Sequence, residues 1–138
     1  MVTPSRRIVI DTGILISASI WGGVPRQALN KAIDSCVLIF TQGTLLELTR
    51  VLSYNKFDAY LSLETRLELV RGFSSVAQLA TVGVPIRECE DPNDDIILEA
   101  AFYGQADCVI ASDKKIAKMH PFRGIPIFSP TQYACGNN

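Results

Sequence analysis

Short apolar runs alternate with amphipathic stretches along most of the chain. Runs of strand length occur at residues 7–10, 37–40, 108–110 and 126–128, with a weaker run at 79–84. Apolar residues at helical spacing occupy residues 25–33, 45–52, 63–73, 93–103 and 114–118. Strands that alternate with helices predict an α/β fold with a mainly parallel sheet, right-handed crossovers and helices on both faces.

Length and composition fit a single domain over residues 1–138. Hydrophobic residues make up 48% of the chain, enough for a sizeable core. No apolar run reaches the length of a membrane span, and residues 1–7 lack the apolar region of a signal peptide. Four dispersed cysteines without a C-x-x-C pair favour reduced thiols. We therefore expect a cytoplasmic protein without membrane contact.

The overall charge limits the kinds of partner. The formal net charge is -1 and the isoelectric point is about 5.8. A strongly basic surface that holds nucleic acid mainly by neutralising phosphates is therefore excluded. Any contact with RNA or DNA must be local.

Four acidic residues fall near the ends of predicted strands, where parallel sheets place their functional sites. Asp11 follows the first strand, Asp113 follows "CVIAS", Glu47 lies in the expected first turn after "VLIFTQGT", and Asp94 opens the helix in "DPNDDIILEAA". Each alone is explained by helix capping. Asp11 and Asp113 suit N-caps, Thr44-x-x-Glu47 has the form of a capping box, and Asp91-Pro92 is typical of a helix start.

Taken together, the four acids indicate a metal site. Carboxylates gathered in one cleft repel one another, by about 1 kcal/mol per close pair in water and about 4 at an effective dielectric of 20. Capping does not require them to converge, whereas a hard divalent cation such as Mg²⁺ or Mn²⁺ does. His120 is the only histidine, so the chain offers few of the ligands that zinc prefers. Asp95 and Glu99 are alternatives to Asp94 as a ligand.

The motifs resemble the PIN-domain ribonucleases, especially the toxins of toxin–antitoxin systems. "IVIDTGILISAS" is similar to the opening strand motif, "GTLLELTRVLSYNKF" to the segment with the second acid, and "DPNDDIILEAAFYGQADCVIASDKKI" to the segment with the last two. "FRGIPIFSPTQYA" is similar to the final strand and helix.

That resemblance implies a central parallel sheet in 3-2-1-4-5 order, an Mg²⁺- or Mn²⁺-dependent endoribonuclease, a homodimer and an antitoxin partner. It also implies that Asp11, Glu47, Asp94 and Asp113 are the catalytic and metal-binding acids. Two positions depart from the family pattern. Gly13 stands where the family usually has Asn, and Ala111 stands where it usually has Thr or Ser. Ser112 is a candidate to replace the missing hydroxyl.

Other interpretations remain at this point. The triplet Asp11-Thr12-Gly13 is also the half-site of aspartic proteases, but these need a second copy and a mostly β framework. A phosphoryl-accepting receiver domain needs paired acids after the first strand, and Asp11 is flanked by Ile10 and Thr12. A PIN-like domain that binds RNA or protein without catalysis is the main alternative.

Several polar residues near the acids are candidate substrate contacts. They are Thr12, Ser112, Arg26 and Lys114. Trp21, in "SIWGGVPRQ", could stack on an unpaired base while Arg26 contacts phosphate. The more common role of such a tryptophan is to cover the core at a loop.

Overall fold

The computed structural model describes residues 6–136. It contains a sheet of five parallel strands in the order β3-β2-β1-β4-β5. The strands are β1 (Arg6–Ile10), β2 (Cys36–Phe40), β3 (Gln78–Leu79), β4 (Cys108–Ile110) and β5 (Ile127–Phe128). The predicted α/β fold and the implied 3-2-1-4-5 order are both confirmed. The expectation about a signal peptide rests largely on residues 1–5, which lie outside the described residues.

Helices connect the strands. The longer ones are α1 (Thr12–Ile20), α2 (Gly23–Ser35), α3 (Gln42–Leu52), α4 (Leu63–Val76) and α5 (Asp95–Tyr103). The shorter ones are η1 (Asn55–Phe57), η2 (Pro92–Asp94), α6 (Lys114–Ala117) and α7 (Pro130–Cys135). Within residues 6–136, no helix has both the length and the apolar character needed to cross a membrane.

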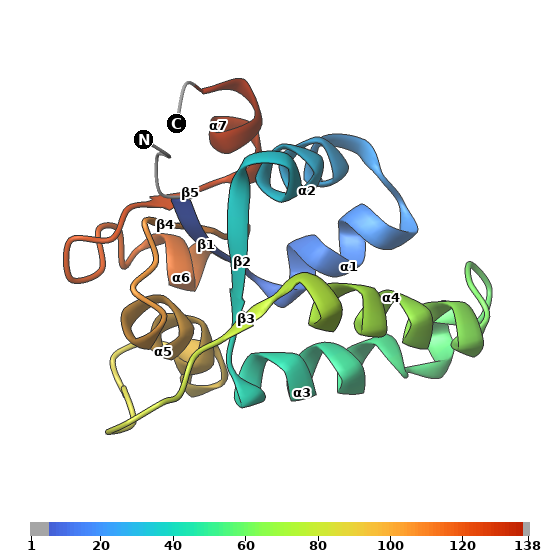
Figure 1. Cartoon of the computed structure of the whole chain (residues 1–138), viewed down its shortest axis with the longest axis horizontal. Coiled ribbons are helices and arrows are strands. Elements are labelled where there is room, and N and C mark those ends of the chain that lie inside the picture. The colour runs from blue at the N-terminus through green and yellow to red at the C-terminus, as the bar shows by residue number, and fades with distance from the viewer. Residues whose placement is uncertain (1–5, 137–138) are drawn as a thin grey trace.

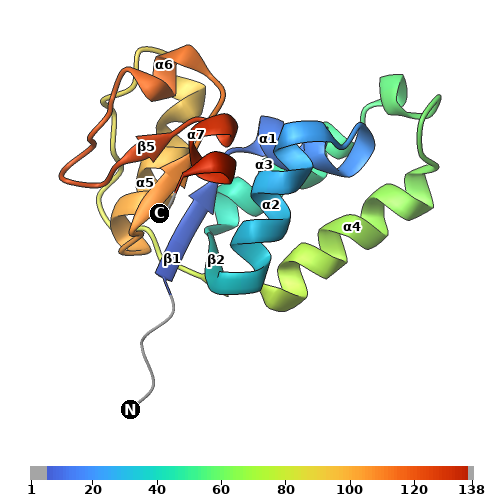
Figure 2. The same ribbon diagram turned by 90° about the horizontal axis from the view of Figure 1, so that it is seen from above.

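Alternate residues of the strands build two separate apolar layers. Ile8, Ile10 and Ile110 pack in one layer with α1, α2, α3, α4 and α7. Val9 and Val109 pack in the other with α5 and α6. Figures 1 and 2 show α5 and α6 on one side of the strands, and α1, α2 and α4 on the other. Burial of both faces explains why the strands are continuous apolar runs.

The apolar pattern alone did not predict α1. Its residues Ile14, Leu15, Ile16 and Ala18 are buried and lie on several sides of the helix. A helix that is apolar nearly all round lacks the 3.6-residue alternation that marks an amphipathic helix. Its start is nevertheless specified locally, because the Asp11 side chain accepts a hydrogen bond from the backbone N–H of Ile14.

Candidate active site

The first part of the site is the junction of β1 and β4. The two strands pair in parallel with Ile10 opposite Ile110, so their carboxyl ends coincide. The backbone N–H of Asp11 donates to the carbonyl of Ile110 at 2.9 Å. Because Asp113 follows β4 by three residues, the two acids that come after strands lie at the same edge of the sheet.

Asp11 is nearly enclosed at this junction. It is 5% exposed, its Oδ1 accepts from the N–H of Ile14 at 2.9 Å, and its Oδ2 accepts from the N–H of Ser112 at 3.1 Å. One carboxylate therefore caps α1 and ties it to the end of β4. Burial raises the pKa of Asp11, although its hydrogen bonds to backbone amides oppose that rise.

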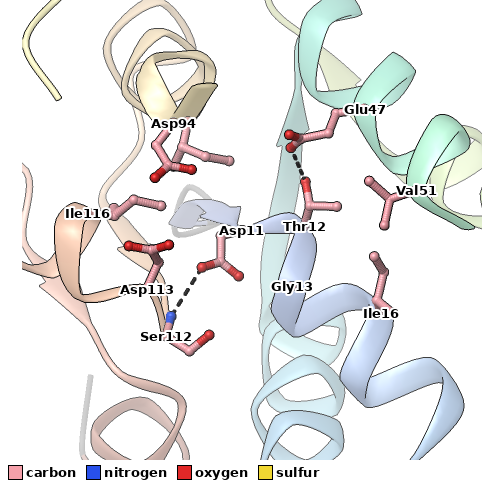
Figure 3. A pocket seen from close by; sticks show the side chains of 11 residues that line it. Asp11, Thr12, Gly13, Ile16, Glu47, Val51, Asp94, Ser112, Asp113 and Ile116 are labelled. Carbon is pink, nitrogen blue, oxygen red and sulfur yellow. Dashed lines mark hydrogen bonds between the residues drawn. The ribbon is translucent and has the colours of Figure 1, made fainter. Parts of the chain in front are cut away.

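Asp113 is an exposed acid with a cap role. Its Oδ1 accepts from the N–H of Lys115 at 2.7 Å at the start of α6. The cap predicted from sequence is present. Its carboxylate lies at the same hollow as those of Asp11 and Asp94 (Figure 3).

Glu47 reaches the site from the second turn of α3, and the predicted capping box at Thr44 is wrong. The helix begins one turn earlier, where Thr41 is the N-cap and exchanges hydrogen bonds with Thr44. Glu47 therefore has no capping role. Its Oε2 accepts a hydrogen bond from the Thr12 hydroxyl at 2.6 Å. Its Oε1 lies 3.9 Å from Arg50 Nη2.

Asp94 is the acid that the fold leaves unpaired. Asp91, not Asp94, caps η2 through the N–H of Asn93 at 3.0 Å. Among residues 6–136, Asp94 Oδ2 is the one buried side-chain oxygen or nitrogen without a hydrogen-bond partner. Desolvation, followed by the charges of Asp113, Asp91, Glu47 and Asp11, raises the pKa of Asp94 to about 6. The carboxylates therefore share one electrostatic environment.

The structure distinguishes Asp94 from the two alternative ligands. Asp95 is buried, and its Oδ1 accepts from the N–H groups of Glu88 and Cys89 at 3.1 and 2.8 Å. Glu99 Oε2 accepts from the N–H of Ile86 at 3.1 Å. Both hold the segment before η2 in place, and neither lines the site.

All four predicted acids line one cleft of about 320 Å³. Figure 3 shows Asp11, Asp94 and Asp113 around its interior, with Glu47 and Thr12 joined across from them. The rest of the lining is Gly13, Ile16, Val51, Ile97, Ser112 and Ile116. Sequence reasoning missed Ile16 and Val51 in the cleft wall, because both belong to helices whose apolar residues also fill the core.

The cleft suits a cation that keeps much of its own water. Among residues 6–136, no three acidic, histidine or cysteine side chains are gathered closely enough to enclose an ion. Mg²⁺ is usually bound through only one or two carboxylates and retains several waters. The unpaired Oδ2 of Asp94, facing acids from three other segments, fits that requirement.

The predicted substrate contacts separate into two groups. Thr12 and Ser112 line the cleft. Arg26 and Lys114 do not: Arg26 Nε donates to the carbonyl of Ala18 at 2.6 Å, and Lys114 is exposed at the start of α6.

The two departures from the family pattern occupy different places. Gly13 lines the cleft, where an added Cβ would lie 3.7 Å from Asp11 Oδ1. Ala111 is 2% exposed and packs in the apolar layer with α5 and α6.

Comparisons with known proteins agree with this architecture. The family model described as "PIN domain" matches residues 7–115. The fold is similar to that of VapBC2 from Rickettsia felis, whose crystal contains a DNA fragment from its promoter. That match has 13% identity, covers 89% of this chain and 98% of the other, and has a TM-score of 0.61. PAE2754 from Pyrobaculum aerophilum matches with 9% identity, 94% and 87% coverage, and a TM-score of 0.63. A search of curated protein sequences found no match.

The family model spans most of the chain, including Asp11, Glu47, Asp94 and Asp113. The protein therefore belongs to the PIN-domain family.

Proposed function

We propose that this protein is an Mg²⁺- or Mn²⁺-dependent endoribonuclease that hydrolyses RNA phosphodiester bonds. The observation that carries the proposal is the unpaired oxygen of Asp94 in a cleft with three other acids. Such an arrangement is unfavourable without a cation, since burial and the charges of the neighbouring acids raise the pKa of Asp94. Family membership supports nuclease chemistry.

Each acid has a distinct task in this proposal. Asp94 and Asp113 would hold the cation, and Asp11 is fixed beside them by backbone amides. The Thr12 hydroxyl fixes Glu47 across the cleft, where its carboxylate can orient a water. A bound divalent cation supplies a more acidic water and offsets the charge that develops on the phosphate. The pocket lining offers no cation of its own among the described residues, so phosphate must rely on that ion.

The toxin component of a toxin–antitoxin system is the biological role that we propose. The motif resemblance and the fold shared with VapBC2 support it. An antitoxin protein and a second copy of the chain are the proposed partners.

Metal-dependent cleavage of a generic single-stranded RNA tests the chemistry. The parent should cleave in Mn²⁺ and not in EDTA, whereas Asp94→Asn should lose activity. Asp34→Asn, which removes an exposed carboxylate from α2, is the matched control and should behave as the parent. Mn²⁺ should also stabilise the folded parent, by about 2.7 kcal/mol at a hundredfold excess over Kd.

A parent that binds RNA without cleaving it would favour the alternative, a PIN-like module that only binds RNA or protein. Absence of any thermal shift at millimolar Mn²⁺ would rule out the metal site.

A further inference from the structure

A second hollow of about 390 Å³ lies next to the acidic cleft. Gly13, Ile16 and Val51 line both. The rest of the second hollow, which we call the aromatic groove, is lined by Ser17, Trp21, Lys56, Phe57 and Tyr60. A chain with one phosphate in the cleft would therefore have its next nucleotide beside this groove.

Trp21 has only in part the role favoured for it from the sequence, that of covering the core. It is 57% exposed, and Tyr60 beside it is 56% exposed. The Trp21 ring meets Tyr60 edge-on with centroids 5.4 Å apart and meets the buried Phe57 at 6.2 Å. The rings of Trp21 and Tyr60 thus remain accessible, and the buried Phe57 packs against Trp21.

Lys56 gives the groove the cation that the acidic cleft lacks. Its Nζ lies 5.2 Å from the Phe57 ring centroid. Among the described residues that line either hollow, it is the single lysine or arginine. An aromatic platform with one neighbouring cation matches a nucleotide, in which a flat base is joined to a phosphate.

The groove is built in advance of any ligand. The segment between α3 and α4 carries Lys56, Phe57 and Tyr60, and the fully buried Arg66 of α4 holds it. The Arg66 guanidinium donates to the carbonyls of Leu52 and Tyr54 at 2.6 and 3.0 Å, and it pairs with Asp58. A platform fixed in this way loses little conformational entropy when it binds.

We infer that the aromatic groove of Trp21, Lys56 and Tyr60 binds an unpaired base of the RNA next to the phosphate held in the acidic cleft. This inference rests on the proposed function and specifies its substrate as single-stranded RNA. Bases in a duplex are stacked on one another and cannot lie on protein rings, whereas those of a single strand can.

Intrinsic fluorescence measures binding at the groove directly, because Trp21 is the only tryptophan of the chain. Titration in Ca²⁺, which also binds carboxylate oxygens, with a short single-stranded RNA should quench Trp21, and the same sequence annealed to its complement should quench it far less. Gel electrophoresis of the same samples checks that the RNA stays intact, so that the signal is independent of cleavage.

Variants of Tyr60 and Trp21 separate stacking from other contacts. Tyr60→Ala should weaken single-strand binding by about 5- to 150-fold, the usual range for loss of one stacked base. Tyr60→Phe keeps the ring and should bind as the parent does. Trp21→Ala, followed by anisotropy of labelled RNA, should show a loss similar to that of Tyr60→Ala. Phe102→Ala removes a half-exposed ring that lines neither hollow and is the matched control.

The results distinguish this inference from the proposed nuclease function. Quenching by single-stranded RNA without Mn²⁺-dependent cleavage would keep the groove and reject the nuclease. If the parent cleaves RNA but shows no quenching, and Tyr60→Ala has no effect, the inference of base binding is overturned. The groove would then be assigned to a protein partner. Equal quenching by duplex and single strand would likewise overturn base stacking.

Discussion

Asp11 and Asp94 face the same cleft, but the fold uses their oxygens differently. Both oxygens of Asp11 accept backbone N–H groups, from α1 and from the end of β4. Asp94 Oδ2 is buried and accepts nothing from the described residues. Asp11, which follows a strand, can therefore stabilise the fold and take part in the chemistry, whereas the charged form of Asp94, at the start of α5, destabilises the fold unless a cation or a proton neutralises it.

The largest expected difference between the two acids is in stability. Asp11→Asn should lower the free energy of unfolding by about 1–3 kcal/mol, because its amide NH₂ would face a backbone N–H donor. Asp94→Asn should leave the stability unchanged or raise it, since it removes a charge that the neighbouring acids disfavour. Both variants should lose nuclease activity. Urea unfolding of the two variants and the parent measures this contrast, and equal stability losses would contradict it.

Thr12→Val tests whether Glu47 depends on its partner across the cleft. Valine keeps the shape of threonine but removes the hydroxyl that donates to Glu47 Oε2. Loss of such a supporting hydrogen bond typically reduces metal affinity or activity by about 10- to 100-fold. Single-turnover cleavage over a range of Mn²⁺ concentrations measures it. Thr12→Ser, which retains a hydroxyl, should lose much less, and an equal loss would show that the methyl group matters instead.

The raised pKa of Asp94 predicts how the site responds to pH. Its folded value of about 6 exceeds the ordinary 3.8, so the folded protein retains this proton while the unfolded chain releases it. The contribution of Asp94 to stability is therefore greatest at acid pH and declines as the pH rises to about 6. Because a cation competes with the proton, Mn²⁺ affinity should fall about tenfold per pH unit below about 6. Calorimetric titration across this range checks it, and an affinity independent of pH would contradict a role for Asp94.

The smallest expected effects concern the two departures from the family pattern. Gly13→Asn has room beside Asp11 and should raise metal affinity or cleavage rate several-fold, since polar groups that support a ligand change these by up to about 10- to 100-fold.

Ala111→Thr instead adds volume and a hydroxyl to an apolar layer and should lower the free energy of unfolding by about 1–3 kcal/mol. Mn²⁺ titration and thermal unfolding of each single variant separate the two. A Gly13→Asn variant that folds normally but gains nothing would show that water already supports Asp11.

Much of this architecture was predictable, because the strands and the helix starts of a parallel sheet each leave a local pattern in the sequence. The apolar runs predicted the strands, and acids at helix starts predicted one edge of the sheet. The capping box was wrong because Thr41 and Thr44 both stand three residues before a polar side chain, and only the helix start distinguishes them. The choice of Asp94 over Asp95 depends on which carboxylate meets the amides of Glu88 and Cys89, a contact with a segment that has no regular pattern.

The aromatic groove was only partly predictable, for a related reason. The sequence singled out Trp21, but Tyr60 is 39 residues away and belongs to a stretch without helical or strand periodicity. Their contact depends on how α4 packs against α3 and draws the intervening segment toward α1.

The buried Arg66 also changes how that segment should fluctuate. Surface loops ordinarily open by themselves and exchange their amide hydrogens quickly. Here the carbonyls of Leu52, Tyr54 and Leu61 all accept from one guanidinium at the first turn of α4. The segment should therefore open together with that turn as one cooperative unit, so that amide exchange around Phe57 follows the local unfolding of α4 rather than the motion of a free loop.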